Sequence, residues 1–458
     1  MEKELPNEID ELKAIIKMLL VEIEQLKAEN AELRNRLGLN SENSNTPPSS
    51  DGLKKKPALP KLKTSKNGGQ KGHKGNTLKQ VSHPDTVIIQ KPEICTCCGE
   101  LLHQNKIEIV SKRQVFDLPP QKLIVTEYQQ GKIICQCGNI ELGHYPVDVT
   151  QPAQYGYNVK ALCVLLSVQY KMPQEQIGQL FDDLYQSPLN TSTVIHYLNT
   201  AYTRLEPLEI QIKNQLLQEK VVHFDETGVR VEGKTKWLHT ACNEKYSYLF
   251  VHEKRGFIAL NSEQSLIKDF KNKAVHDCWA SYFKFDTEHI ICNAHILREL
   301  TQLIEQNSQW AKQFHGFLLD CYYKNIAIET VEYRYTEIIN QANLEEPQQS
   351  KRVNRRGKPK KTKGRCLLER LIKYKDGVLA FIFDSAIPFT NNQAERDIRC
   401  VKIKMKVSGC FRTQLGVNAY ARIQSVISTF RKQNIEVFKS FSLLFSQENF
   451  ELLRLNNG

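Results

Sequence analysis

The stretch 221–228, with the sequence VVHFDETG, decides the fold class of this chain. Its apolar and polar residues alternate with a period of two, which predicts a β-strand. Val222 and Phe224 would share one face of this strand, and His223 and Asp225 the other. Gly228 follows shortly after, so we expect Asp225 near the C-terminal end of the strand. The sequence thus predicts an acidic side chain at the edge of a sheet.

The segments that follow this strand predict the rest of the sheet. Residues 236–242 and 246–252 form two apolar runs around an Asn-Glu-Lys turn, which predicts a hairpin. We expect a helix over 258–270 and a further strand over 273–277, which again terminates in an acid, Asp277. Strand, hairpin, helix and strand, with Asp at two strand ends, is the order of a ribonuclease-H-like sheet. In such a sheet Asp225 and Asp277 would converge.

A third acidic residue, Glu395, opens a predicted helix in the stretch 389–399, FTNNQAERDIR, which precedes the basic run KIKMK at 402–406. Helical spacing places four polar residues on one face: Glu395, Arg399, Lys402 and Lys406. The neighbouring apolar stripe consists of Ala394, Ile398, Val401 and Met405. A carboxylate beside a row of cations suits an enzyme that holds a divalent metal next to a polyphosphate backbone. The alternative is an ordinary surface ion pair between Glu395 and Arg399.

Length and charge narrow the class of protein. A chain of 458 residues predicts two or three domains, and a formal net charge of +12 predicts an acidic partner, for which nucleic acid fits better than a membrane. The sequence shows neither a transmembrane-length apolar run nor a signal peptide, so cytoplasm is the expected compartment. Without a secretory signal, the 13 cysteines are expected to be reduced thiols and metal ligands.

The first 39 residues carry a regular heptad repeat, which predicts a parallel two-stranded coiled coil. β-Branched residues at one core position, Leu at the other and one core Asn favour a dimer in fixed register. The alternative is a single amphipathic helix packed on its own domain. A basic-zipper factor is excluded, because here the basic stretch follows the zipper. The residues expected to form the dimer seam are Ile9, Leu12, Ile16, Leu19, Ile23, Leu26, Asn30 and Leu33.

Residues 40–82 are rich in Asn, Ser, Pro, Gly and Lys, and predict a flexible basic linker. Lys71 and Lys74 lie in its GGQKGHKG stretch and are candidates for contact with DNA phosphates. The alternative is that the linker lysines are only solvated charge.

Two cysteine knuckles predict a four-cysteine zinc ribbon within residues 83–150. Each knuckle is followed by Gly, which lets a turn present both sulfurs. Cys95 and Cys98 have the usual C-x2-C spacing, whereas Cys135 and Cys137 are one residue closer together, so the second knuckle is irregular. A ribbon that folds without metal is the alternative. Residues 123–128 between the knuckles have a strand-like sequence.

Residues 156–205 are expected to be helical, and two segments within them resemble a helix-turn-helix. These are 173–181 and 190–198, the second capped by Asn190 or Thr191. Small helical bundles produce the same pattern, so DNA binding by this segment is one of two interpretations.

Six motifs in one order resemble those of the insertion-sequence 66 family of transposases. They are DETG at 225–228, WLH at 237–239, HD-x-W at 276–279, CNAH-x-LREL at 292–300, NN-x-AER at 391–396 and SG-x-FR at 408–412. The resemblance extends to the leucine-zipper start, the GGQ-x-GHKG linker and the cysteine ribbon. It therefore covers nearly the whole chain.

The resemblance implies a DDE transposase whose catalytic triad falls on Asp225, Asp277 and Glu395. Three carboxylates would hold two Mg²⁺ or Mn²⁺ ions for phosphoryl transfer on DNA. Arg396 joins the basic face of the helix, Arg399, Lys402 and Lys406, as a candidate for DNA phosphates. Cys292 and His295 are expected to support the site rather than bind Mg²⁺, because this hard ion does not favour thiolate. Partners would be transposon ends and target DNA, a second copy of the chain, and accessory proteins of the same element.

The predicted fold class is therefore a multidomain α+β protein. Its expected parts are a coiled coil (1–39), the linker (40–82), the zinc-ribbon-like module (83–150), a helical, helix-turn-helix-like segment (151–215), a ribonuclease-H-like core (216–415) with a helical insertion at about 300–375, and a C-terminal helical segment (416–458). Residues 351–365 form a basic loop in the insertion, which either grips DNA or faces solvent. Two functional alternatives are a catalytically silent DNA-binding protein and a nuclease of the same fold that does not join DNA.

Overall fold

The computed structural model describes residues 13–23, 26, 43, 78–102, 107–348 and 361–446. The chain divides into two compact units, one over residues 53–126 and the other over the remainder, and each is described by itself. Several predicted features lie outside the described residues: Ile9, Leu12, Asn30, Leu33, Lys71, Lys74 and most of the basic loop 351–365. Within the described ranges, no helix is both long enough and apolar enough to cross a membrane.

Residues 13–23 are helical, as the heptad repeat predicts. Ile16, Leu19 and Ile23 of the predicted seam are 54%, 48% and 45% exposed, and Leu26 is also exposed. An apolar seam that faces solvent in a single chain is compatible with a second helix covering it. The parallel dimer stays a prediction.

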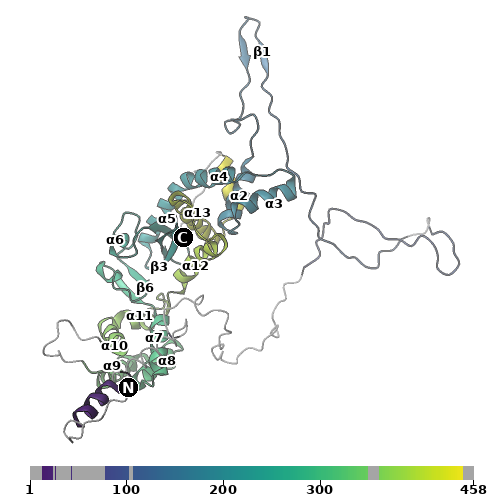
Figure 1. Ribbon diagram of the computed structural model, residues 1–458. Coiled ribbons are helices and arrows are strands. Elements are labelled where there is room, and N and C mark those ends of the chain that lie inside the picture. The colour runs from purple at the N-terminus through teal and green to yellow at the C-terminus, as the bar shows by residue number, and fades with distance from the viewer. Residues whose placement is uncertain are drawn as a thin grey trace, which may run out of the picture. The chain divides into compact units, whose positions relative to one another are not determined.

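A five-stranded mixed sheet forms the centre of the larger unit, in the order β5-β4-β3-β6-β7 (Figure 1). The strands are β3 (Val221–Val231), β4 (Lys234–Cys242), β5 (Ser247–His252), β6 (Lys273–His276) and β7 (Glu288–Ile291). β4 is antiparallel to both β3 and β5, whereas β6 is parallel to β3 and β7 is parallel to β6. The predicted hairpin is confirmed, and its turn is held by Asn243, whose Oδ1 accepts hydrogen bonds from the amides of Lys245 and Tyr246 at 2.9 and 2.7 Å.

Strand β3 is longer than the alternation pattern predicts. It continues to Val231, so the expectation that Asp225 lies near the C-terminal end of the strand is wrong. The reason is that β3 pairs with two partners over different lengths. Its parallel pairing with β6 stops at His223, but its antiparallel pairing with β4 continues to Val231. Asp225 therefore lies at the end of the parallel pairing and not at the end of the strand.

The helix expected over 258–270 is also wrong in extent, because only α6 (Phe257–Leu260) forms. The polar residues after it favour turns. The Ser262 hydroxyl donates to the Ala259 carbonyl at 2.7 Å, and the Ser265 amide donates to the Ser262 carbonyl. Such local bonds compete with helix propagation.

Helices from both ends of the larger unit share one apolar core with the sheet. Helix α12 (Asn392–Ser408) packs on β3 and β4, and α13 (Gln414–Lys432) packs on β5. The other helices of this core are α2 (Tyr157–Val168), α3 (Gln174–Tyr185), α4 (Thr191–Arg204), α5 (Glu206–Gln218) and α14 (Val437–Ser446). The helices predicted over 156–205 are confirmed, and Asn190 caps α4 by accepting from the Ser192 amide at 3.0 Å.

Five helices between β7 and α12 form a group with a core of its own (Figure 1). They are α7 (Asn293–Glu305), α8 (Gln309–Tyr322), α9 (Ile328–Glu345), α10 (Lys363–Lys373) and α11 (Lys375–Phe383). Trp310 and Phe314 are fully buried at the centre of this core. The group packs against the sheet through α11, which contacts β7. The helical stretch predicted between the second and third acidic positions is confirmed.

The ribbon region contains little regular structure. β1 (Lys132–Ile134) and β2 (Ile140–Leu142) form an antiparallel hairpin around the second cysteine knuckle. The strand-like stretch 123–128 forms no strand, so that expectation is wrong. Ile124 and Val125 there are 90% and 89% exposed, and apolar alternation forms a stable strand only where a partner strand or core covers it.

Candidate active site

The fold brings Asp225, Asp277 and Glu395 together from three separate elements. In the parallel pairing of β3 with β6, the last pair is His223 with Val275. Asp225 and Asp277 each lie two residues beyond that pair, so they stand at the same level of neighbouring chain segments, just past the end of the parallel pairing. Glu395 lies in the first turn of α12, which packs directly on β3. The parallel register thus explains why two acids 52 positions apart meet (277 minus 225).

The electrostatics of Asp225 reflect this convergence. Burial raises the pKa of its carboxyl well above the usual range, the neighbouring Glu226 raises it further, and the negative charges of Asp277 and Glu395 also raise it. The Glu226 amide donates to Asp225 Oδ1 at 2.8 Å and partly offsets these effects. A buried carboxyl whose pKa is raised by burial and by neighbouring negative charges favours a bound cation.

Asp277 is held in place by the turn that follows β6. Its Oδ1 accepts a hydrogen bond from the Trp279 amide at 3.0 Å. Burial raises the pKa of Asp277, and this amide together with the charges of Arg255 and Arg370 opposes the rise. The carboxylate is therefore oriented by the backbone and surrounded by cations that do not bond to it directly.

Glu226 and Arg255 are residues of the site that sequence reasoning missed. The side chain of Glu226 is 2% exposed and paired with Arg255 at 2.8 Å. It also accepts from the Tyr282 hydroxyl at 2.6 Å. Arg255 lies over two indole rings, Trp237 at 4.9 Å and Trp279 at 4.4 Å. Both tryptophans belong to the motifs WLH and HD-x-W. Their presence in these motifs was the sequence signal that could have identified Arg255 and Glu226 as neighbours of the site.

Helix α12 is docked as its sequence predicts. Ala394, Ile398 and Val401 are buried, and Met405 is partly buried against the same core. Asn391, just before the helix, is 2% exposed and ties it to β3: Nδ2 donates to the Phe224 carbonyl at 2.8 Å, and Oδ1 lies 2.8 Å from His223 Nδ1. The two Asn contacts fix the first turn of α12, and with it Glu395, beside Asp225.

Glu395 does not form the surface ion pair that was the alternative interpretation. Among the residues that the structure describes, no ion pair joins it to Arg399, and its Oε1 is buried without a hydrogen-bond partner. Cys292 and His295 lie beside it: one ligand atom from each of the three residues lies within 4.8 Å of the others. Burial raises the pKa of the Cys292 thiol to about 11 and lowers that of His295 to about 4. The two residues predicted to support the site thus contact its third acid.

The cations of α12 divide into an exposed set and a buried one. Arg396, Arg399, Lys402 and Lys406 are exposed. The Nζ of Lys402 donates to the Gly228 carbonyl at 3.1 Å, and burial lowers the pKa of Lys402 whereas the charge of Asp225 raises it. Lys404 of the same basic run is 9% exposed and donates to three carbonyls, those of Ser167, Lys171 and Met172. Lys404 is therefore a structural cation, which no local sequence pattern distinguishes from its neighbours.

Two other acids of the same region, Asp286 and Asp384, do not belong to the group of Asp225, Asp277 and Glu395. Asp286 is an exposed partner of Lys271, with its side chain 96% exposed. Asp384 ends α11, where its Oδ1 accepts from the Ala386 amide at 2.9 Å, and its Oδ2 pairs with Lys273. Asp384 thus stabilises the turn after α11.

The donor chemistry fits hard divalent cations. Asp225, Asp277 and Glu395 supply carboxylate oxygens, which Mg²⁺ and Mn²⁺ prefer. Within the described residues the Oε1 of Glu395 is an acceptor without a hydrogen-bond partner, and a cation would satisfy it.

The cysteine knuckles are described separately, because they belong to different units. In the first, Gly99 adopts a left-handed φ of 75°, and hydrogen bonds from Cys98 and the Cys97 amide lower the pKa of Cys95. In the second, Gly138 has a φ of 85°, and the Cys137 amide lowers the pKa of Cys135. The turns thus present their thiols toward backbone donors, as a metal-binding knuckle requires. Joint zinc binding by Cys95, Cys98, Cys135 and Cys137 stays a prediction.

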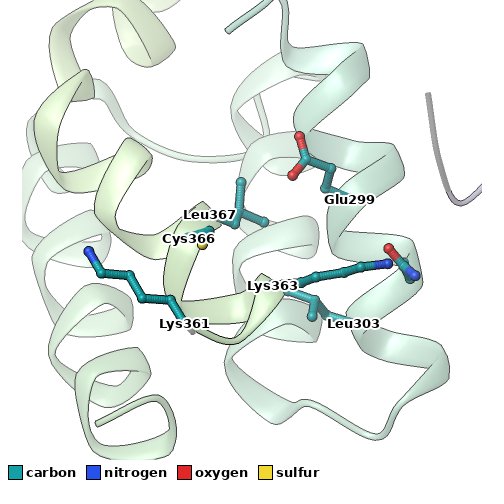
Figure 2. A pocket seen from close by; sticks show the side chains of 7 residues that line it. Glu299, Leu303, Lys361, Lys363, Cys366 and Leu367 are labelled. Carbon is teal, nitrogen blue, oxygen red and sulfur yellow. The ribbon is translucent and has the colours of Figure 1, made fainter. Parts of the chain in front are cut away.

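A small pocket of about 140 Å³ lies in the helical insertion, between α7 and α10. Its lining residues are Glu299, Gln302, Leu303, Lys361, Lys363, Cys366 and Leu367. Figure 2 shows the Lys361 and Lys363 side chains extending in opposite directions at the start of α10, with Glu299 on the facing helix. None of the three converging acids lines this pocket.

Comparison with known families supports the motif analysis. Residues 152–419 match the family model described as "Transposase IS66 family". Residues 92–138 match a "zinc-finger binding domain of transposase IS66", which supports zinc binding by the ribbon, and residues 1–79 match a family of unknown function. The chain is also 23% identical, over 398 residues, to the uncharacterized protein y4hP of Sinorhizobium fredii. That alignment covers 77% of this chain and 70% of the relative.

Proposed function

This chain belongs to the IS66 family of transposases, and we propose from that premise that it cleaves and joins DNA at a DDE active site formed by Asp225, Asp277 and Glu395. The family match includes all three residues and implies DNA binding. The observation that carries the proposal is the geometry around β3: Asp225 and Asp277 both lie two residues past the last pair of the parallel β3–β6 pairing, and α12, with Glu395 in its first turn, packs on β3. This arrangement supports a shared site for three acids from three elements, of the kind that metal-dependent phosphoryl transfer requires.

The strand order supports a ribonuclease-H-like core for this site. Three antiparallel strands are followed by two parallel ones, with the first strand in the centre. Asp225 comes from that central strand and Asp277 from the end of its parallel neighbour. The helical insertion between Asp277 and Glu395 is long enough to form its own core, so it leaves the catalytic sheet intact.

The roles of the residues follow from their positions. Asp225, Asp277 and Glu395 would hold two Mg²⁺ or Mn²⁺ ions. When bound, these ions supply activation of water or a DNA 3′-hydroxyl and stabilisation of the leaving oxygen. Lys402, which borders the acids, and the exposed Arg396, Arg399 and Lys406 would hold the scissile and flanking phosphates. Hydrolysis would free a 3′-hydroxyl at the transposon end, and attack of that hydroxyl on a target phosphodiester would join the two DNAs.

The remaining parts of the chain have roles in the same proposal. The N-terminal heptads would pair two protomers, so that two transposon ends are held together. The zinc ribbon, with Cys95, Cys98, Cys135 and Cys137 as ligands, and helices α3 and α4 would contact DNA at the ends. Accessory proteins of the same element would take part in the assembly, and the protein would act in the cytoplasm on the nucleoid.

Strand transfer tests this function. The substrate is a labelled, pre-cleaved transposon end with plasmid target and Mg²⁺, and the variants are Asp225→Asn, Asp277→Asn and Glu395→Gln. We expect each variant to lose joining while retaining end binding in a gel-shift assay. Near-normal joining by any variant would remove that residue from the triad. Asp286→Asn is the matched control, because Asp286 is an exposed acid outside the group.

The same assay separates the two alternative functions. A wild-type protein that binds ends but neither cuts nor joins them would be a DNA-binding regulator. One that cuts without joining would be a nuclease of the same fold.

A further inference from the structure

The third acid of the proposed triad faces a second set of donors that Mg²⁺ does not use. Cys292 lies just before α7, directly after β7, and His295 lies in the first turn of that helix. Glu395 lies in the first turn of α12, about 100 positions later. One ligand atom from each of the three residues lies within 4.8 Å of the others.

Two atoms of this group lack a partner. His295 Nδ1 and Glu395 Oε1 are both buried with no hydrogen bond in the described part of the chain. An unsatisfied buried polar atom costs about 1–3 kcal/mol, so two adjacent ones indicate a missing common partner. Cys292 is fully buried, and its sulfur accepts a hydrogen bond from the Asn391 amide at 3.1 Å.

The backbone around the group is held firmly. The Cys292 amide donates to the His276 carbonyl at 3.0 Å, and the Asn293 amide donates to the Phe389 carbonyl at 3.1 Å. Asn391 in turn bonds to Phe224 and His223 of the central strand. The starts of α7 and α12 are therefore fixed side by side, and only side-chain rotations are needed to move the three donors closer.

We propose that Cys292, His295 and Glu395 form a binding site for Zn²⁺ that is separate from the Mg²⁺ site and shares Glu395 with it. Thiolate, imidazole and carboxylate are together the donor set of zinc, whereas Mg²⁺ takes oxygen ligands. Tetrahedral zinc with these donors brings ligand atoms to roughly 3.5 Å from one another. The ligand atoms all lie within 4.8 Å of one another, so the contraction that zinc requires is at most about 1.3 Å, which is small for side chains. Binding releases the thiol proton of Cys292 to solvent.

The site has a functional consequence that rests on the proposed function. A carboxylate engaged with Zn²⁺ at Cys292 and His295 is withdrawn from Asp225 and Asp277. Zinc would then inhibit strand transfer by occupying Glu395, and its affinity would set the concentration at which transposition stops. Without zinc, the same thiol and imidazole act only as neighbours that orient Glu395.

Metal binding by the full-length chain tests the site directly. Zinc content and Co²⁺ absorption spectra are measured for wild type, Cys292→Ser, His295→Gln and the control Cys163→Ser, which replaces an equally buried thiol in α2. The four ribbon cysteines are unchanged in all chains, so any zinc that they bind is the same in each and cancels when zinc contents are compared. We expect Cys292→Ser and His295→Gln to bind one Zn²⁺ fewer per chain than wild type and to lose part of the thiolate-to-cobalt absorption. Cys163→Ser should match wild type.

Equal zinc content and equal spectra in all four chains would overturn the proposal. Thermal unfolding of each variant shows that it is folded, and His295→Gln, which keeps the buried thiol, serves if Cys292→Ser does not fold. Strand transfer in Mg²⁺ is then titrated with Zn²⁺, and each chain is compared with its own zinc-free rate. We expect a tenfold or larger rise in the inhibitory zinc concentration for His295→Gln, corresponding to about 1.4 kcal/mol of binding free energy.

The two proposals fail in different ways. If the protein performs no strand transfer but Cys292→Ser binds less zinc than wild type, the metal site is supported and the DDE function is overturned. Normal strand transfer with no difference in zinc binding would overturn only the metal site.

Discussion

The converging acids and the cysteine knuckles are both predicted metal sites, but they are built in opposite ways. Asp225 lies in a strand, and Asp277 directly follows another, of a sheet whose core is closed by α12 and α13. Of the cysteine knuckles, Cys97 and Cys98 are exposed in one unit, and Cys135 and Cys137 are exposed in the other unit, at a hairpin of two three-residue strands. The first site is positioned by a packed core. The second has no comparable core, so we expect metal to contribute to its folding.

This difference has an energetic counterpart. Repulsion among buried acids makes the first site costly for the apo protein, and the surrounding core stabilises the fold despite it. In the ribbon, the metal ligands themselves would provide the stability. Removing a carboxylate should therefore stabilise the region of the converging acids, whereas removing a cysteine ligand should unfold the ribbon.

Asp225→Asn should produce the largest functional effect and a gain in stability. We expect strand transfer to fall by about 10³-fold or more, because metal ligation supplies several kcal/mol of transition-state stabilisation. Burial and neighbouring charges raise the pKa of Asp225, so its ionised form costs stability near neutral pH and the neutral amide does not. Melting temperature in EDTA should rise, by the equivalent of roughly 1 kcal/mol. A lower melting temperature would show that the carboxylate stabilises the apo fold.

Cys98→Ser should unfold the ribbon and leave the catalytic unit unchanged. We expect loss of the ribbon zinc and at least about tenfold faster proteolysis within residues 92–142, because metal binding is linked to folding there. The main thermal transition should not move. Cys97→Ser is the matched control, since it changes an adjacent exposed thiol outside the predicted ligand set. Equal protease resistance in both variants would mean that the ribbon folds without these ligands.

Acid should weaken the sheet through a buried histidine. Burial lowers the pKa of His239, which is 2% exposed on β4, to about 4. The unfolded chain has the ordinary value near 6.5, so it binds the proton first, and stability is lost as pH falls from about 6.5 toward 4. Between pH 7.5 and 5 this residue should contribute a loss on the order of 2 kcal/mol. Chemical denaturation of His239→Gln should show a correspondingly smaller loss; an unchanged pH dependence would assign the effect to other groups.

The smallest effect is expected at the exposed cations of α12. Lys402→Gln and Lys406→Gln should each weaken DNA binding and lower the slope of log affinity against log salt by about 0.9 per lost phosphate contact. Lys439→Gln in α14 is the control, because Lys439 is an exposed lysine with its side chain 74% accessible on another helix. If the salt-dependence slopes of all three variants are equal, DNA does not contact Lys402 or Lys406.

Local sequence patterns predicted secondary-structure elements correctly where contacts between residues close in the chain determine the structure. The β4–β5 hairpin, the Asn190 cap of α4 and the apolar stripe of α12 follow from turn chemistry and periodicity. The same patterns overextended the helix after Phe257 and predicted a strand at 123–128. The helix after Phe257 ends where the Ser262 hydroxyl bonds to the backbone. The stretch 123–128 has no partner strand and therefore forms no strand.

The sequence by itself determined the family, the zinc-finger segment, and the acids and cations that are candidates for the site, because motifs and their spacing are local properties. Tertiary structure alone decided which charged groups share a space. It buried Glu226 against Tyr282 and Lys404 against three carbonyls, and it placed Glu395 beside Cys292 and His295. The physical reason is that strand register and helix docking set these contacts across roughly 50 to 240 positions of chain, over which side-chain periodicity carries no information.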